Sequence, residues 1–316
     1  MAQEPLNFET SLAGMKKSDW LAAVEELCDE DGYLEPLGKR HYAAFIEKSD
    51  TLLITFETLQ GIPALSPLAQ PFGWEMMQEH NWSSLCIASN GDTWFRDKAV
   101  YGYFDRLIDD GFFDEFEQVI FYGAGPCGYA AAAFSVASPG ARVLAVQPQA
   151  TLDPRVTEWD DRFTDMRRTD FTSRYGYAPD MMDGADAGYV VYDPRQHLDA
   201  MHAALFTRAN TTKLRIRHMG DAIQTDLLEI EQLKPLLLAI ANDTLNDLSF
   251  AKMMRARRDH RPYLRNVLDA LDAQGRSVFA LAMARNVSSR MHAPRFDRRV
   301  AEADKKSAEE SATKDD

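Results

Sequence analysis

The stretch EQVIFYGAGPCGYAAAAFSV, residues 117–136, decides how the rest of the chain is interpreted. Its first part is apolar and predicts a buried strand, and the alanine-rich part that follows predicts a helix. Gly123, Gly125 and Gly128 lie in or beside the turn between them. Such a strand–turn–helix unit is typical either of a phosphate-binding turn or of a turn that presents a catalytic side chain.

The phosphate-binding interpretation rests on the pattern G-x-G-x-x-G, which the three glycines satisfy. In a dinucleotide-binding unit, an acidic residue at the end of the next strand holds the ribose. Here that strand ends in VLAVQPQ, which offers Gln147 and Gln149 instead. Two further strands are also expected before this unit, whereas the pattern belongs to the first turn of its domain. A nucleotide-binding protein that uses these glycines is therefore a third-ranked hypothesis.

The second interpretation is a nucleophile elbow, a sharp turn that needs small residues on both sides of the nucleophile. Gly123 and Gly128 meet that need, and the alanines allow the helix to lie close to the sheet. The chain order also fits, because an acid is expected after a later strand and Asp193 follows VVY. A histidine is then expected after the last strand.

Apolar strand-like runs alternate with helical patterns through the first 243 residues, which predicts a mostly parallel sheet covered by helices on both faces. Between residues 149 and 186 the pattern is irregular, and a connection of this length is expected to cover a site or to contain short helices. From residue 244 onward the pattern is helical only. The expected strands are 51–58, 83–89, 117–123, 141–148, 188–194 and 212–219.

The composition limits the function classes. The chain has 316 residues, is 45% hydrophobic and has a net charge of −14, so a soluble acidic protein is expected, with nucleic acid and membrane unlikely as partners. Neither a signal peptide nor a spanning segment is expected. Three widely spaced cysteines favour a reducing, cytoplasmic location over a disulfide framework or a zinc site. Residues 252–299 nevertheless hold twelve Lys and Arg against four Asp, which predicts a basic module.

The segment YGAGPCGYAA, residues 122–131, resembles the YGSSMGGYAA elbow of α/β-hydrolase-like proteins that are often associated with surface-polysaccharide loci. The segment VLAVQPQATLDPRVTEWDDRF, residues 143–163, is similar to the part of that family that carries Pro-Gln, Asp-Pro and Asp-Arg pairs. The resemblance covers about residues 40–240. It implies an α/β-hydrolase-like fold, a serine nucleophile, an acid and a histidine, and it raises a link to surface-polysaccharide processes.

This sequence departs from that pattern at the residues that carry the chemistry. Gly125 occupies the nucleophile position, and Pro126 lacks the N–H that would stabilise an oxyanion. The histidine is expected near Ala222, and His218 comes too early. We therefore expect a degenerate elbow, with Asp193 a vestigial acid, in a catalytically silent binding or scaffold protein. The alternative is an active hydrolase or acyltransferase that uses Cys127, at a helix N-terminus that would favour its thiolate, or an unrecognised nucleophile.

Other candidates concern binding. Residues of the segment TEWDDRF, 157–163, are candidates for contacting a ligand or forming a lid, and the basic helices are expected to bind another protein. No cofactor and no metal are expected, because His197, His202 and His218 are irregularly spaced. The expected organisation is a helical lead-in (1–40), an α/β-hydrolase-like domain (41–243), a basic helical module (244–300) and a disordered tail (301–316). The ligand or lid candidates are Trp159, Asp160, Asp161 and Arg162, and the partner-binding candidates are Arg255, Arg257, Arg258 and Arg261.

Overall fold

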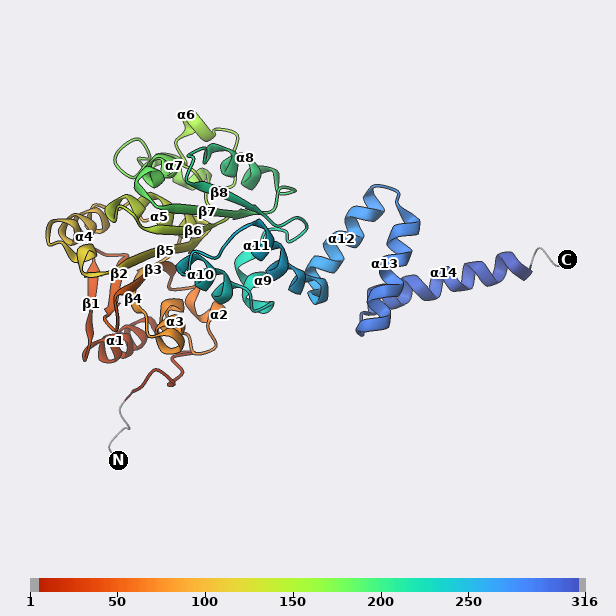
Figure 1. The fold of residues 1–316 in the computed structure, drawn as a ribbon, viewed down its shortest axis with the longest axis horizontal. Helices are drawn as coiled ribbons and strands as arrows, with labels where there is room; N and C mark the ends of the chain where they lie inside the picture. The colour runs from red at the N-terminus through yellow and green to blue at the C-terminus, as the bar shows by residue number, and fades with distance from the viewer. Residues whose placement is uncertain (1–5, 313–316) are drawn as a thin grey trace.

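An eight-stranded sheet forms the body of the protein (Figure 1). The computed structural model describes residues 6–312, with side chains through residue 306. The strand order is β1-β2-β4-β3-β5-β6-β7-β8, in which β2 is antiparallel to both of its neighbours and the other neighbouring pairs are parallel. The strands are β1 Gly32–Leu37, β2 His41–Ile46, β3 Thr51–Thr58, β4 Ser83–Ser89, β5 Gln118–Ala124, β6 Arg142–Val146, β7 Ala187–Tyr192 and β8 Thr211–Arg215.

Helices cover both faces of the sheet because the central strands are apolar on both sides. Alternate residues of β3 show this, since Ile54 packs into the core beneath α4 and α5, whereas Leu53 packs into the core beneath α3 and α10. The helices of the body are α1 Lys17–Cys28, α2 Ile62–Leu65, α3 Phe72–His80, α4 Lys98–Asp109, α5 Pro126–Phe134, α6 Pro154–Thr157, α7 Ala178–Met181, α8 His197–Leu205, α9 Ile223–Glu229, α10 Leu233–Ala241 and α11 Asp247–Met253.

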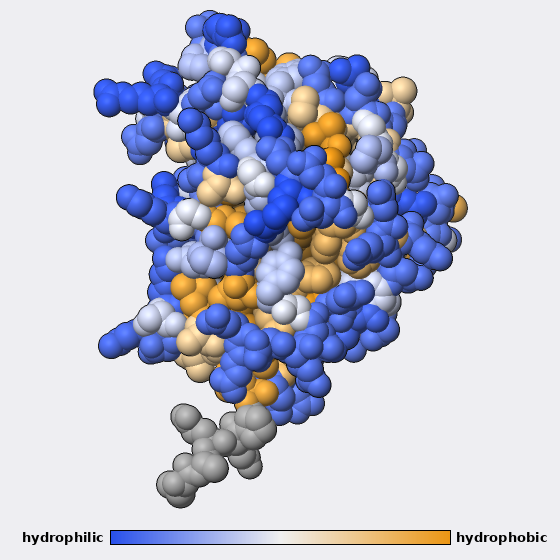
Figure 2. All heavy atoms as spheres, turned by 90° about the vertical axis from the view of Figure 1, so that its left-hand side faces the viewer, coloured by the Kyte–Doolittle hydropathy of each residue, from blue (hydrophilic) through white to orange (hydrophobic). Residues whose placement is uncertain are grey.

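Three further helices, α12 Arg261–Ala273, α13 Ser277–Arg290 and α14 Pro294–Ala312, form what we call the helical arm. The arm extends away from the sheet (Figure 1). It has a small core of its own, to which each helix contributes, as Leu268, Val287 and Phe296 illustrate. None of the described helices is long and apolar enough to cross a bilayer. On the side that carries α4, Figure 2 shows a mainly hydrophilic surface with smaller apolar areas.

The fold class expected from the sequence is confirmed, and the elements near two of the expected domain boundaries can now be placed. Residues 1–40 are not simply a helical lead-in, because β1 lies within them and pairs with β2 along its whole length. A boundary at residue 41 would therefore divide a hairpin. The helical module also begins later than residue 244, since Phe250 of α11 and Met254 pack into the core of the body. The arm proper begins at Arg261.

Part of the segment expected to be a disordered tail, residues 301–316, lies within the described part of the chain. Helix α14 continues to Ala312, so residues 301–312 are helical, and residues 313–316 lie outside the described part of the chain. Its first turns are held by Phe296 and Val300, which pack in the core of the arm. Arg285 of α13 also forms an ion pair with Asp304 at 2.7 Å.

Candidate functional site

The turn between β5 and α5 is sharp, and its glycines explain why. Gly125 has φ 57° and ψ −125°, a backbone conformation that residues with a Cβ rarely adopt. A Cβ on Gly123 would lie 2.2 Å from the Cys127 carbonyl oxygen, and a Cβ on Gly128 would lie 2.9 Å from the Val146 carbonyl oxygen. Gly123 and Gly128 therefore allow the helix to pack against the strands, and Gly125 forms the tip of the turn.

The tip of the turn faces a cavity of about 310 Å³, which we call the elbow cavity. A Cβ on Gly125 would have no heavy atom within 4 Å, so a side chain at this position would enter open space. This is the position of the nucleophile in an elbow. The adjoining residue is Pro126, which has no N–H to offer an oxyanion. Other residues lining the cavity are Ala124, Gln147, Gln149, Arg162, Phe163, Asp199, Asp221, Ala222, Gln224 and Thr225.

Asp193 follows β7, as expected for the acid of a triad, but its carboxylate is engaged with the backbone. It is 1% exposed and accepts hydrogen bonds from the N–H groups of Arg195 and Gly220, both at 2.9 Å. These bonds hold the loop that follows β8. Ala222 of that loop lines the elbow cavity, at the place where a histidine is expected. Among the described residues, no histidine lines the elbow cavity.

His218 lies outside β8, which ends at Arg215, so the expected strand 212–219 is too long. The side chain of His218 instead lines two cavities on the other side of the loop, toward α12. The acid and the histidine of the expected triad are therefore not assembled around Gly125.

Cys127 lies in the first turn of α5 and is buried. Burial raises the pKa of its thiol well above the usual range, and the negative charges of Glu57 and Asp92 raise it further. The thiolate is the reactive form of cysteine, so this environment opposes reactivity at neutral pH. The helix N-terminus that would favour a thiolate is outweighed by the loss of water around the sulfur.

The residues of the TEWDDRF segment form an ordered network beside the elbow cavity. Arg162 pairs with Asp160 at 2.8 Å and with Asp199 of α8 at 2.7 Å. Nε2 of His202 lies 2.9 Å from the Asp160 carboxylate, and both side chains are fully buried. Because Nδ1 of His202 accepts a hydrogen bond from the Ala150 N–H, Nε2 is the donor to Asp160.

This network fixes the charge of Asp160. Burial alone would raise the pKa of its carboxyl, but hydrogen bonds from His202 and Arg162 outweigh it and lower the pKa well below the usual range. Trp159 packs against His202, with ring centroids 4.6 Å apart, and Asp161 is exposed. Of the four candidates in this segment, Arg162 is the one that lines the elbow cavity. His202 and Asp199 complete the network, and their sequence spacing gave no sign of it.

Three of the four partner-binding candidates precede the arm in the chain. Arg255, Arg257 and Arg258 lie in a 3-10 helix, Met254–Asp259, that precedes the arm. The guanidinium of Arg257 lies 4.9 Å from the ring centroid of Tyr263, and Arg261 donates a hydrogen bond to the His292 carbonyl at 3.0 Å.

Asp226, Glu229 and His260 lie close enough together to be considered as metal ligands. Nε2 of His260 lies 2.9 Å from Asp226, whereas Nδ1 lies 3.6 Å from Glu229. The two acids thus face different nitrogens of one ring, which suits a bridge of hydrogen bonds better than a shared ion. His260 precedes α12, and both acids belong to α9. The cluster therefore connects the body to the base of the arm.

The strand order and the elbow define the body as an α/β-hydrolase-like fold. No protein-family model matches the chain, and no curated protein matches it. Among solved structures, the capsule O-acetyltransferase of Neisseria meningitidis serogroup A is 13% identical, with a TM-score of 0.40 over 66% of this chain and 94% of that chain. Est1E from Butyrivibrio proteoclasticus is 15% identical, with a TM-score of 0.42 and coverages of 66% and 98%. The Pyrobaculum calidifontis esterase is 12% identical, with a TM-score of 0.43 and coverages of 67% and 87%.

Proposed function

We propose that this chain is a catalytically silent α/β-hydrolase-like protein that acts by binding. The observation that carries the proposal is the bare tip of the elbow, where Gly125 faces a cavity with no side chain to attack an acyl group. Two further features support it. Pro126 offers no oxyanion N–H, and Ala222 stands where a general base would be needed.

The decisive experiment measures hydrolysis of p-nitrophenyl acetate by the wild-type protein and by Gly125→Ser. Neither is expected to exceed the buffer rate, because a hydroxyl at the tip would still lack a base and an oxyanion donor. Gly125→Ala is the matched control, since it carries the same backbone strain without a hydroxyl. Wild-type turnover that disappears with Cys127→Ala would instead favour the thiol alternative. Strong activity in Gly125→Ser alone would show that a base does reach the tip.

We also propose that the helical arm docks on an acidic protein surface. The arm, residues 261–312, holds ten Lys and Arg against seven Asp and Glu, and the 3-10 helix before it adds Arg255, Arg257 and Arg258, so this end of the chain is basic within a chain of net charge −14. Val278 and Phe279, at the start of α13, are 77% and 57% exposed. Arg276 lies beside them, with its guanidinium 4.2 Å from the Phe279 ring centroid. An apolar pair next to an arginine is typical of the anchor of a protein interface.

The test of docking compares the proteins that co-purify with the wild type and with a Val278→Ser, Phe279→Ser variant. Loss of a specific partner in the variant is expected, and lower salt should strengthen its capture by the wild type. Leu248→Ser is the matched control because Leu248 is 64% exposed but lies on α11, outside the arm. An unchanged set of partners in the double variant would reject the role of the arm.

A further inference from the structure

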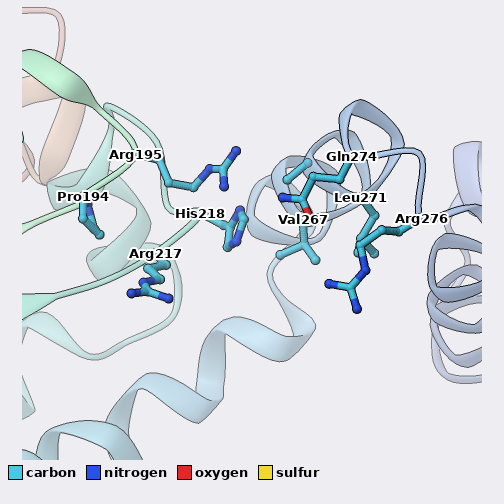
Figure 3. A pocket seen from close by; sticks show the side chains of 9 residues that line it. Pro194, Arg195, Arg217, His218, Val267, Leu271, Gln274 and Arg276 are labelled. Carbon is cyan, nitrogen blue, oxygen red and sulfur yellow. The ribbon is translucent and has the colours of Figure 1, made fainter.

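A cavity of about 400 Å³ lies between the body and the arm, separate from the elbow cavity (Figure 3). Arg195 lines it from the loop after β7, and Arg217 and His218 line it from the loop after β8. Gln274 and Arg276 reach it from the end of α12 and the turn that follows. In Figure 3, Arg195 and His218 extend from the body toward the gap, and Val267 and Arg276 lie on the arm's side of it. None of the described residues lines both this cavity and the elbow cavity.

The charge around this cavity is not balanced by the protein. Arg195, Arg217 and Arg276 are exposed, and none of the three forms an ion pair with a described side chain. Two of the nearby carboxylates are already engaged, whereas Asp221, which lines the adjoining cavity together with Arg195 and His218, forms no ion pair with a described side chain. Asp193 accepts two backbone hydrogen bonds, and Asp269 pairs with Arg295 of α14. Three arginines that form no ion pair therefore line one cavity, which suits it to an anionic ligand.

His218 adds an unused polar atom to the same place. Its Nδ1 is buried and has no hydrogen-bond partner in the described part of the chain. An unpaired buried polar atom costs stability, so its presence calls for an explanation. The carbonyl of His218 accepts a hydrogen bond from Asn266 of α12 at 3.0 Å, which fixes the loop against the arm. The backbone of His218 is thus held in position at the wall of the cavity.

From this convergence of unpaired arginines and an unsatisfied imidazole, we propose that the cavity binds the phosphate group of a small phosphate ester. Guanidinium groups match phosphate oxygens in charge and in their planar array of donors. A volume of about 400 Å³ exceeds that of a phosphate group alone, and Val267 and Leu271 offer an apolar wall for the organic part. Since Arg195 and Arg217 belong to the body and Arg276 follows α12, the ligand bridges the body and the arm. This site does not depend on whether the elbow is silent.

The experiment measures binding of phenyl phosphate by isothermal titration calorimetry, with phenol as the uncharged control and inorganic phosphate as the minimal ligand. We expect phenyl phosphate to bind saturably, inorganic phosphate to bind more weakly, and phenol not to bind. Replacing one arginine that contacts phosphate, in Arg217→Gln or Arg276→Gln, is expected to weaken binding at least about tenfold. Arg298→Gln is the matched control, because Arg298 is an exposed arginine outside the cavity and should leave affinity unchanged.

A second measurement locates the ligand without relying on variants. Burial lowers the pKa of His218, and the charges of Arg195, Arg257 and Arg217 lower it further, against an opposing effect of Asp193. A bound phosphate should therefore raise the pKa of this imidazole, which NMR can follow. Absence of saturable binding to the wild type would overturn the proposal. So would equal weakening in Arg298→Gln, or a His218 titration that phenyl phosphate does not move.

Discussion

Replacing Asp160 by asparagine should destabilise the protein and change how its stability depends on pH. The carboxylate of Asp160 is fully buried and accepts hydrogen bonds from His202 and from the Arg162 guanidinium. The asparagine side chain would keep the size but lose the negative charge, and its amide N–H groups would face the donors of His202 and Arg162. The variant would also weaken the link of the segment between β6 and α7 to α8, leaving the Arg162–Asp199 ion pair in place.

The expected loss at pH 7 is about 3 kcal/mol, at the lower end of the range for breaking a buried ion pair. The lower end is appropriate because the Arg162 side chain remains 33% exposed and keeps part of its hydration. The pH dependence follows from the depressed pKa of Asp160. Its stabilising effect is fully present above the unfolded pKa of about 3.9 and is lost as pH falls toward the folded value. The difference between the two proteins should therefore be constant from about pH 7 to 5 and shrink below about pH 4.

Urea unfolding at pH 7, 5 and 3.5, followed by circular dichroism, measures these free energies. Asp161→Asn is the matched control, because Asp161 is the adjacent aspartate and is exposed. It should change stability by no more than about 0.5 kcal/mol. A loss below about 1 kcal/mol for Asp160→Asn at pH 7 would refute the assigned role of the network. A loss that is the same at every pH would refute the electrostatic part of the reasoning.

Two further predictions concern the elbow. Gly123→Ala should lower the free energy of unfolding by at least about 3 kcal/mol, because its Cβ would lie 2.2 Å from the Cys127 carbonyl oxygen. Gly184→Ala is the control in thermal unfolding and should be close to neutral, because its Cβ would have no heavy atom within 4 Å. The thiol of Cys127 should react with a thiol-directed reagent at pH 8 only as fast as the protein opens, since burial and the charges of Glu57 and Asp92 raise its pKa; rapid labelling of Cys127 in the native protein, located by mass spectrometry, would contradict this.

The sequence sufficed for the five strands from β3 to β7 because these are short apolar runs bounded by clear turns, whereas β8 is mostly polar and is shorter than the expected strand 212–219. It did not suffice for β1, where Glu35 and Pro36 interrupt the pattern. That strand lies at the edge of the sheet and is mostly half-buried, so neither apolarity nor alternation marks it. After β8 the chain forms two helices, α9 and α10, which are separated where Glu231 adopts φ 55°.

The candidate site was predictable only where its residues are local in sequence. The elbow glycines and the Asp160–Arg162 pair lie within a few residues of each other, so a short motif is enough to point to them. The cavity at the arm has no such signature. Arg195, Arg217 and Arg276 come from three distant segments, which meet because β7 and β8 end side by side and α12 lies opposite. Long-range placement of this kind is a property of the fold rather than of any window of sequence.

The three glycines of the elbow are needed for different physical reasons. Gly123 and Gly128 are required by packing, because a Cβ at either position would approach backbone atoms too closely whether or not the protein is an enzyme. Gly125 is different, since only its backbone angles are demanding. A serine there would store about 1–3 kcal/mol of strain, which a hydrolase tolerates for the sake of its nucleophile and which glycine avoids. Retention of the sharp turn is therefore no sign of catalysis. The cavity between body and arm is the more informative feature, because the unsatisfied buried nitrogen of His218 costs stability and the three arginines that line the same cavity form no ion pair.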